Sequence, residues 1–350
     1  MKHDPDPQHC RVTGQASAPT VGRQLLLAAV PALALAFLGP ALVAAQTPEP
    51  IAPIPFQLEL DQRKVNLGEA LFHDVRLSKD NENACSSCHD LDNGGDDGLA
   101  KSKGLGGKAG KRNTLTIFNS TLNFRMMWDG RFASSEQQVE AAIHDPAVMG
   151  TTWPAILDKL AQDQALTQAF AGLYPQGMQP QTITDALVVY ERSLITPNAR
   201  FDRFLRGDAA ALDPDELEGY RLFKTYGCAS CHQGVNVGGN MFQVFGVLGM
   251  PGDYFRSHGP VADPDFGLYN TTKAEEDKFV FRVPSLRNVA LTAPYFNDGS
   301  AATLTEAVDA MAKYQLGRQI PPRDNALIVA FLRTLTGEYK GRPLDARVSQ

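Results

Sequence analysis

The sequence has little tryptophan and little cysteine, and it has no excess of positive charge. Lys and Arg number 33 against 39 Asp and Glu, which gives a formal net charge of −6. A chain without a basic excess lacks the electrostatic footprint of a nucleic-acid-binding protein, so no nucleic-acid partner is expected. Charged residues make up 21% and hydrophobic residues 43% of the chain, which excludes wholesale disorder. The 350 residues are enough for about two domains.

A long apolar run lies near the N-terminus. Residues 25–43 are almost wholly apolar, two arginines precede them, and small residues follow up to Ala45. This order is typical of a secretory signal peptide. A retained membrane anchor is the alternative, because about 20 apolar residues can cross a bilayer, but Pro31 and Pro40 interrupt the run. We interpret residues 1–45 as a signal peptide cleaved near Ala45, and the mature protein as periplasmic.

Four of the five cysteines form two closely spaced pairs, and a histidine follows each pair. The two segments are Cys85-Ser86-Ser87-Cys88-His89 and Cys228-Ala229-Ser230-Cys231-His232. Two thiols at this spacing can add to the two vinyl groups of one haem, and the adjacent imidazole then reaches the iron as the proximal ligand. Disulfides, a redox pair or a zinc site would leave the repeated histidine unexplained. The sequence therefore predicts two haem c groups whose irons are bound by His89 and His232.

The sixth ligand of each iron decides its chemistry. A haem with His and Met ligands suits electron transfer, whereas an open position binds a small ligand. After the second motif, the methionine candidates are Met241, Met250 and Met311. Met311 is preferred because it lies between the motif and the terminal helix, so the chain can return on the opposite face of the porphyrin. A core methionine is the alternative interpretation.

Helical periodicity dominates the rest of the chain, and no convincing run of alternating strands is present. Apolar spacing predicts helices over 61–77, 135–143, 155–173, 182–194, 214–223, 306–313 and 325–336. Trp153 and Asp185 are expected helix starts.

An internal repeat predicts two similar domains. A helix with a Leu-Phe pair precedes each cysteine motif, at Leu71-Phe72 and at Leu222-Phe223. The expected fold is mainly α, with two cytochrome c-like domains, each wrapped around one covalently bound haem and carrying long loops. We place the N-terminal domain at 46–198 and the C-terminal domain at 199–350.

With these motifs placed, the sequence resembles the bacterial dihaem cytochrome c peroxidases, including the related dihaem enzymes of methylamine dehydrogenase maturation. The resemblance is carried by residues 67–72, 76–78, 85–89, 94–99, 128–131, 283–288, 294–296 and 331–337.

The resemblance implies a division of labour between the two haems. The C-terminal haem, with His232 and Met311, would receive electrons from a small cytochrome c or cupredoxin. The N-terminal haem, with His89, would be the hydrogen peroxide site. Trp128 matches a tryptophan that lies between the haems of the family. The resemblance also implies a possible homodimer.

A calcium ion between the domains is a further implication of the resemblance. Asn113, Thr292 and Pro294 match the ligand positions, and the latter two would use backbone carbonyls. Oxygen ligands are what a hard cation prefers.

The sequence departs from the family pattern around the peroxide site. Val148 stands where the family has a catalytic glutamate, although the distal Gln138 is retained. Leu105 replaces a histidine that caps the iron, and Asn297 replaces another histidine. His144 is predicted as a replacement base, against the alternative of a surface histidine near a helix end.

Three functions remain open on this pattern. The first is a periplasmic peroxidase that reduces hydrogen peroxide to water. The second is a dihaem oxidase that modifies a protein residue over a distance. The third is a non-catalytic electron-transfer or sensor protein, which the apolar Leu105 and Val148 favour.

Overall fold

Short capped helices and long irregular connections make up the fold. The structure is a computed structural model and describes residues 49–344, so the predicted signal peptide and its cleavage site lie outside the described residues. The α-helices are α1 (Gln62–Phe72), α2 (Ser135–His144), α3 (Trp153–Leu160), α4 (Gln164–Leu173), α5 (Pro180–Ser193), α6 (Arg200–Leu205), α7 (Pro214–Thr225), α8 (Asp253–Ser257), α9 (Tyr269–Thr272), α10 (Leu304–Ala310) and α11 (Pro322–Arg333). The prediction of a mainly helical fold is confirmed.

Strands are few and short in the described part of the chain. β1 (Phe242–Val244) pairs antiparallel with β2 (Val280–Arg282), with Phe242 opposite Arg282. β3 (Glu338–Tyr339) pairs antiparallel with β4 (Arg342–Pro343). Within residues 49–344, no helix has the length and apolar character that a membrane crossing requires.

Two helix predictions were wrong in detail. The run predicted over 155–173 is two helices, because Asp163 begins a new one: its side chain accepts a hydrogen bond from the backbone N–H of Leu166 at 3.0 Å. The helix expected to start near Asp185 begins at Pro180, where the fixed proline φ suits the first helical turn.

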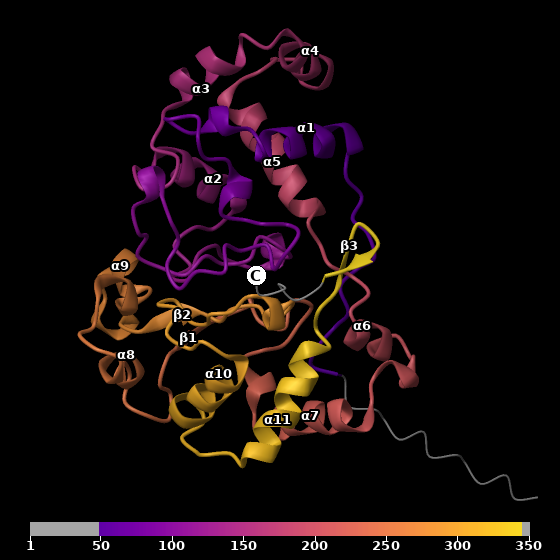
Figure 1. The fold of residues 1–350 in the computed structure, drawn as a ribbon, viewed down its shortest axis with the longest axis vertical. Coiled ribbons are helices and arrows are strands. Elements are labelled where there is room, and N and C mark those ends of the chain that lie inside the picture. The colour runs from indigo at the N-terminus through magenta and orange to yellow at the C-terminus, as the bar shows by residue number, and fades with distance from the viewer. Residues whose placement is uncertain (1–48, 345–350) are drawn as a thin grey trace, which may run out of the picture. The chain divides into compact units, whose positions relative to one another are not determined.

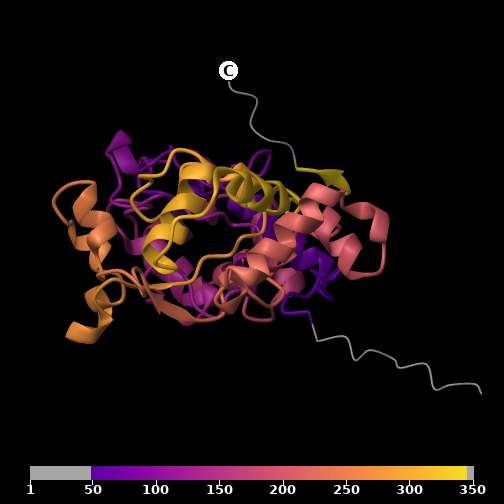
Figure 2. The ribbon, with the colours of Figure 1, turned by 90° about the horizontal axis from the view of Figure 1, so that it is seen from below.

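Two helix crossings provide the most extensive helix-on-helix packing of the fold. α1 lies against α5, and α7 lies against α11 (Figure 1), and Figure 2 again shows α7 and the yellow α11 side by side. Glycine permits both close approaches. A Cβ atom on Gly68 would lie 2.0 Å from the carbonyl oxygen of Ala186, and one on Gly219 would lie 2.0 Å from that of Leu327. Both crossings therefore depend on a glycine where the two helix backbones come closest.

The loops that follow the two helix crossings also repeat the same backbone turns. Asn119 and Asn288 both have φ of +59°, and each precedes a single helical turn, η4 (Ser120–Leu122) and η9 (Val289–Leu291). Further along, Gly130 and Gly299 have φ of 62° and 66°. The two halves of the chain therefore share backbone conformation at these equivalent asparagine and glycine positions.

Buried residues form two main clusters that follow this repeat. The first consists mainly of residues between Val65 and Leu194, and the second of Ile51 and residues between Phe201 and Leu335. The predicted domain bounds, 46–198 and 199–350, stay a prediction.

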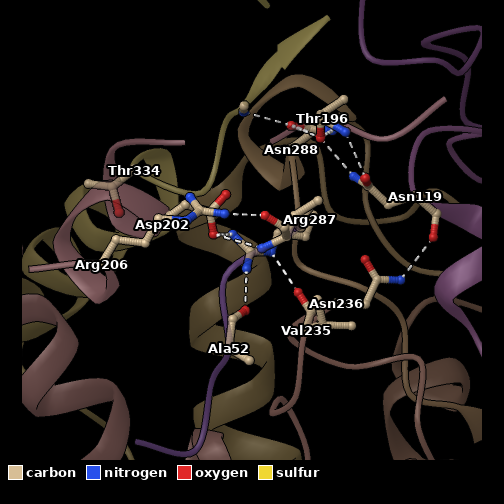
Figure 3. A network of polar contacts seen from close by, with 12 residues as sticks. Ala52, Asn119, Thr196, Asp202, Arg206, Val235, Asn236, Arg287, Asn288 and Thr334 are labelled. Atoms are coloured by element: carbon tan, nitrogen blue, oxygen red, sulfur yellow. Dashed lines mark hydrogen bonds and ion pairs between the residues drawn. The ribbon is translucent and has the colours of Figure 1, made fainter. Parts of the chain in front are cut away.

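A buried ion pair ties the N-terminal segment to the second cluster (Figure 3). Arg287 Nη1 lies 2.8 Å from Asp202 Oδ1, and both side chains are fully buried. Arg287 also donates to the carbonyl oxygens of Val235 at 3.0 Å and Ala52 at 2.9 Å. These bonds hold the extended segment around Ala52 in place.

The repeated asparagines meet at the centre of the same network (Figure 3). Asn119 and Asn288 each donate to the hydroxyl of Thr196, at 2.8 Å and 3.0 Å. Asn236 donates to the carbonyl oxygen of Asn119 at 3.2 Å. The network therefore joins one repeated turn to the other.

Candidate functional site

The two cysteine motifs have the same local structure. Each begins in a single 3₁₀ turn, η2 (Cys85–Ser87) or η6 (Cys228–Ser230). All four thiols are free, so none is used in a disulfide. Burial raises the pKa of the Cys85 thiol to about 12 and that of Cys228 to about 11. The rival interpretation of these cysteines as disulfides is not supported.

Both motif histidines are prepared to bind a metal through Nε2. His89 Nδ1 lies 3.1 Å from the carbonyl oxygen of Gly95, and His232 Nδ1 lies 3.3 Å from that of Val237. A carbonyl only accepts, so Nδ1 carries the proton and Nε2 keeps its lone pair. Burial lowers the pKa of His89 and lowers that of His232 to about 4, which keeps both rings neutral.

One continuous cavity of about 1080 Å³ is lined by both motifs. This volume exceeds the roughly 300–1,000 Å³ of a site for one drug-sized ligand. Its lining includes apolar side chains from both helix crossings, among them Phe72, Leu187, Phe223 and Ile328. Free thiol pairs, neutral imidazoles and a large apolar cavity fit two covalently bound haem groups.

The internal repeat exposes one decisive difference between the halves. α2 has Ser134 as its N-cap and α10 has Thr303. Counted from these caps, Ala142 occupies the position of Met311, and both line the cavity. Met311 begins a π-helical turn, η10 (Met311–Gln315), a feature often found at functional sites. A thioether can bind iron and a methyl group cannot, so a sixth protein ligand is offered in one half alone at this position.

The predicted distal residues are only partly brought together. Gln138 and Val148 line the cavity, and Val148 is 41% exposed. Leu105 is not among the lining residues and packs instead on the turn at Gly150. Its backbone N–H donates to the carbonyl oxygen of Ala147 at 3.2 Å. The loop that carries Leu105 therefore borders the distal turn without filling the cavity.

His144 does not join this group. Its Nδ1 lies 3.1 Å from the carbonyl oxygen of Thr151, and its Nε2 lies 3.0 Å from Glu140 Oε1. The side chain is 42% exposed and is not among the cavity-lining residues. Both ring nitrogens are engaged on the outer face of α2, so the geometry does not support the predicted role as replacement base.

Trp128 lies at the cavity wall. Its side chain is buried and lines the cavity, and its indole N–H donates to the carbonyl oxygen of Asn113 at 3.0 Å. Asn297 holds the equivalent position in the second repeat, and its carbonyl oxygen accepts from the N–H of Asn113 at 2.9 Å. Asn113 therefore connects the two equivalent positions.

The predicted calcium ligands lie partly together. Asn113 Nδ2 donates to the carbonyl oxygens of Leu99 at 2.9 Å and Pro294 at 3.2 Å. A 180° turn of this amide would direct Oδ1 at the same point, which would gather three oxygen ligands of the kind calcium prefers. Thr292 also lines the cavity. Between residues 49 and 344, no group of three or more His, Cys, Asp and Glu side chains could hold a metal ion.

Arg282 and Glu191 are buried charged residues at the cavity that were missed from the sequence. Arg282 donates from Nε to the carbonyl oxygen of Met127 at 3.0 Å, and burial lowers its pKa to about 10. Glu191 lies on the last turn of α5, is 7% exposed and lines the cavity. The signal for Glu191 was present in the repeat, because the equivalent position of α11 holds an apolar residue, Leu332.

Comparisons with known proteins agree with this geometry. The family described as "Di-haem cytochrome c peroxidase" matches residues 62–210. The chain is 45% identical to cytochrome c peroxidase Ccp of Escherichia coli K12, over 83% of this chain and 62% of that protein. It is 39% identical to cytochrome c551 peroxidase of Nitrosomonas europaea, over 83% of this chain and 85% of that protein.

A solved structure shares the fold over most of the chain. It is a MauG-like protein associated with microbial copper homeostasis, 28% identical with a TM-score of 0.69, and the match covers 84% of this chain and 95% of that one. The chain spans less than two thirds of the Escherichia coli relative and most of the other two proteins. As its motifs predicted, the chain belongs to the di-haem cytochrome c peroxidase family.

Proposed function

We propose that this protein is a periplasmic cytochrome c peroxidase, which reduces hydrogen peroxide to water with electrons from a small cytochrome c or cupredoxin. One observation carries the proposal. Met311 faces the cavity in the half that contains His232, whereas its equivalent in the half that contains His89 is Ala142. Two sites that differ in this way suit an electron entry point and a site for a small ligand.

Membership of the family implies two haem c groups, which would supply the electron-transfer and peroxide-binding chemistry when bound. Cys85 and Cys88 would hold one haem, and Cys228 and Cys231 the other. His89, His232 and Met311 would bind the irons. Gln138 would hydrogen-bond the peroxide, because an amide can donate and accept at once.

Trp128 and Asn113 would position the region between the two haem sites. The indole hydrogen bond to the Asn113 carbonyl fixes the ring at the cavity wall. Calcium bound by Asn113, Thr292 and Pro294 would tighten the same contact, because it would hold the residue on which the indole rests.

Exposed apolar residues next to the Met311 turn support docking of the electron donor in this half. Leu248 is 64% exposed and Met250 is 66% exposed. Their loop is tied to the π-helical turn, since the N–H of Gly246 donates to Gln315 Oε1 at 2.9 Å. A small donor protein with an apolar contact face would bind here, close to the proposed entry haem.

Stopped-flow mixing of reduced protein with peroxide, followed by turnover with a reduced cytochrome c or cupredoxin, tests the function. We expect turnover well above that of free haem. A His144→Ala variant is the control and should react at an unchanged rate, because His144 lies outside the cavity. Turnover no faster than free haem would refute the proposal.

Val148 favours one alternative, a non-catalytic electron carrier or ligand sensor. It lines the cavity where the family has a proton-transferring glutamate, and a valine cannot move a proton. In that case the oxidised protein would be low-spin at both haems and would not bind cyanide. Electron paramagnetic resonance of the oxidised and half-reduced protein distinguishes the two functions.

A further inference from the structure

Three cavity positions that are apolar in the C-terminal half are polar in the N-terminal half. The pairs are Ser135 and Leu304, Gln138 and Ala307, and Glu191 and Leu332, all of which line the cavity. The first two pairs follow from the equivalent caps of α2 and α10. The polar side chains gather in the half where the catalytic glutamate of the family is missing.

The equivalence of Glu191 and Leu332 follows from the helix crossings. Gly68 meets Ala186 in one crossing, and Gly219 meets Leu327 in the other. Five residues after these contacts, α5 carries Glu191 and α11 carries Leu332. Leu332 is 3% exposed, so an apolar side chain fills this position well. The crossing itself therefore does not require a carboxyl group.

Glu191 has a specific neighbour on α2. The side chain of Ser135 hydrogen-bonds to it, and Ser135 is itself 6% exposed. Ser135 and Gln138 are three residues apart on this helix, so they lie on the same face. Glu191, its partner Ser135 and Gln138 therefore all border the cavity, the last two from the same face of α2.

Burial keeps Glu191 protonated at neutral pH. Desolvation raises the pKa of its carboxyl group to about 8, although the bond from Ser135 favours the ionised form. The negative charge of Glu136 on α2 acts in the same direction as burial. Cys85 is the other neighbour that interacts with Glu191, and in the haem-loaded protein its sulfur would be an uncharged thioether. The protonated carboxyl group of Glu191 can therefore act as a proton donor at the cavity.

We propose that Glu191 stores a proton for the N-terminal half and passes it through Ser135 into the cavity, where Val148 cannot act. The inference rests on the proposed function. Reduction of hydrogen peroxide to two waters takes up two electrons, which the donor supplies, and two protons. The Glu191 O–H bond breaks, its proton moves to the Ser135 oxygen, and Ser135 releases its own proton to a peroxide oxygen. Solvent then reprotonates the Glu191 carboxylate, and a second passage along the same path delivers the second proton, so that the O–O bond breaks and two waters are formed.

Infrared difference spectroscopy of the haem-loaded protein tests the stored proton without measuring activity. The carbonyl stretch of a protonated carboxylic acid should disappear as the pH is raised through about 8. Glu191→Gln should lack this transition. Glu136→Gln is the matched control at an exposed neighbour, and it should keep the transition with a lower midpoint, because a repelling charge is removed. A transition unchanged by Glu191→Gln, or no transition in the wild type, overturns the inference.

The peroxide reaction tests the delivery step. The wild-type rate should fall as the pH rises through about 8, since only the acid form can donate. Glu191→Gln should be slower by about 10²–10⁴-fold and independent of pH in this range. Ser135→Ala should slow the reaction while keeping the infrared transition. An unchanged rate in both variants overturns delivery by this path.

Glu191→Leu separates the loss of the carboxyl group from a folding defect. The equivalent buried position holds Leu332, so a leucine should fit there. This variant should bind two haems, lack the infrared transition and react as slowly as Glu191→Gln. Wild-type rates in Glu191→Leu would overturn the inference. If the wild-type protein consumes no peroxide, the proposed function fails, and the infrared titration still decides whether Glu191 holds the proton.

Discussion

We propose that one side chain decides whether each half offers a second ligand to its haem. Met311 lines the cavity at the start of a π-helical turn, and its equivalent Ala142 ends in a methyl group. Replacing Met311 by Ala should therefore open a coordination position in the C-terminal half. We expect the oxidised Met311→Ala protein to bind one more cyanide per molecule than the wild type, measured by optical titration.

Met250→Ala is the matched control for this prediction. Met250 follows the same cysteine motif but is 66% exposed, and it is not among the cavity-lining residues. Its loss should leave the cyanide stoichiometry unchanged. Equal stoichiometry in Met311→Ala and the wild type would contradict the assignment of Met311 as a ligand.

Among the elements, the two helix crossings depend on glycine where backbone meets backbone. A Cβ atom on Gly68 would lie 2.0 Å from the carbonyl oxygen of Ala186, which cannot move without distorting α5. Gly68→Ala should therefore lower the free energy of unfolding by at least about 1–3 kcal/mol, the usual cost of overpacking. Denaturant titration followed by circular dichroism measures this change.

Gly172→Ala provides the comparison on another helix. A Cβ atom there would meet nothing within 4 Å, and Gly172 is exposed in the last turn of α4. The same substitution should be neutral or stabilise by up to about 1 kcal/mol, because alanine favours a helix over glycine. A loss of stability as large as that of Gly68→Ala would mean that the crossing is not the cause.

At the scale of the whole molecule, the buried pair of Arg287 and Asp202 joins segments far apart in sequence. Both side chains are fully buried at 2.8 Å, and Asp202 also accepts from the N–H of Ile54 at 3.3 Å. Asp202→Asn would leave the Arg287 charge buried without its partner. We expect the free energy of unfolding to fall by about 3–5 kcal/mol, measured by denaturant titration.

Glu218→Gln is the comparison, because it breaks an ion pair that is exposed to solvent. Glu218 and Arg221 pair at 2.6 Å on the surface of α7, with 38% and 58% of their side chains exposed. Water and salt screen this pair, so its loss should leave the denaturation midpoint unchanged. Equal losses of stability in Asp202→Asn and Glu218→Gln would show that burial does not explain the contribution of the Asp202–Arg287 pair.

Local patterns were sufficient for the features that depend on neighbours in the sequence. The spacing of each cysteine pair and its histidine predicted two haem attachment sites, and apolar periodicity predicted the main helices. The family followed from the same motifs, and the comparisons confirmed it. The split between α3 and α4 was missed because capping by Asp163 competes with an unbroken apolar pattern.

Only the tertiary structure decided which polar residues reach the cavity. His144 and Glu191 are both titratable residues near helix ends, yet the first faces outward and the second lines the cavity. Sequence position cannot separate them, because the face a side chain presents depends on how α2 and α5 pack. The burial that raises the pKa of Glu191 is likewise a property of that packing, whereas the two haem attachment motifs were recognisable from residue type and spacing alone.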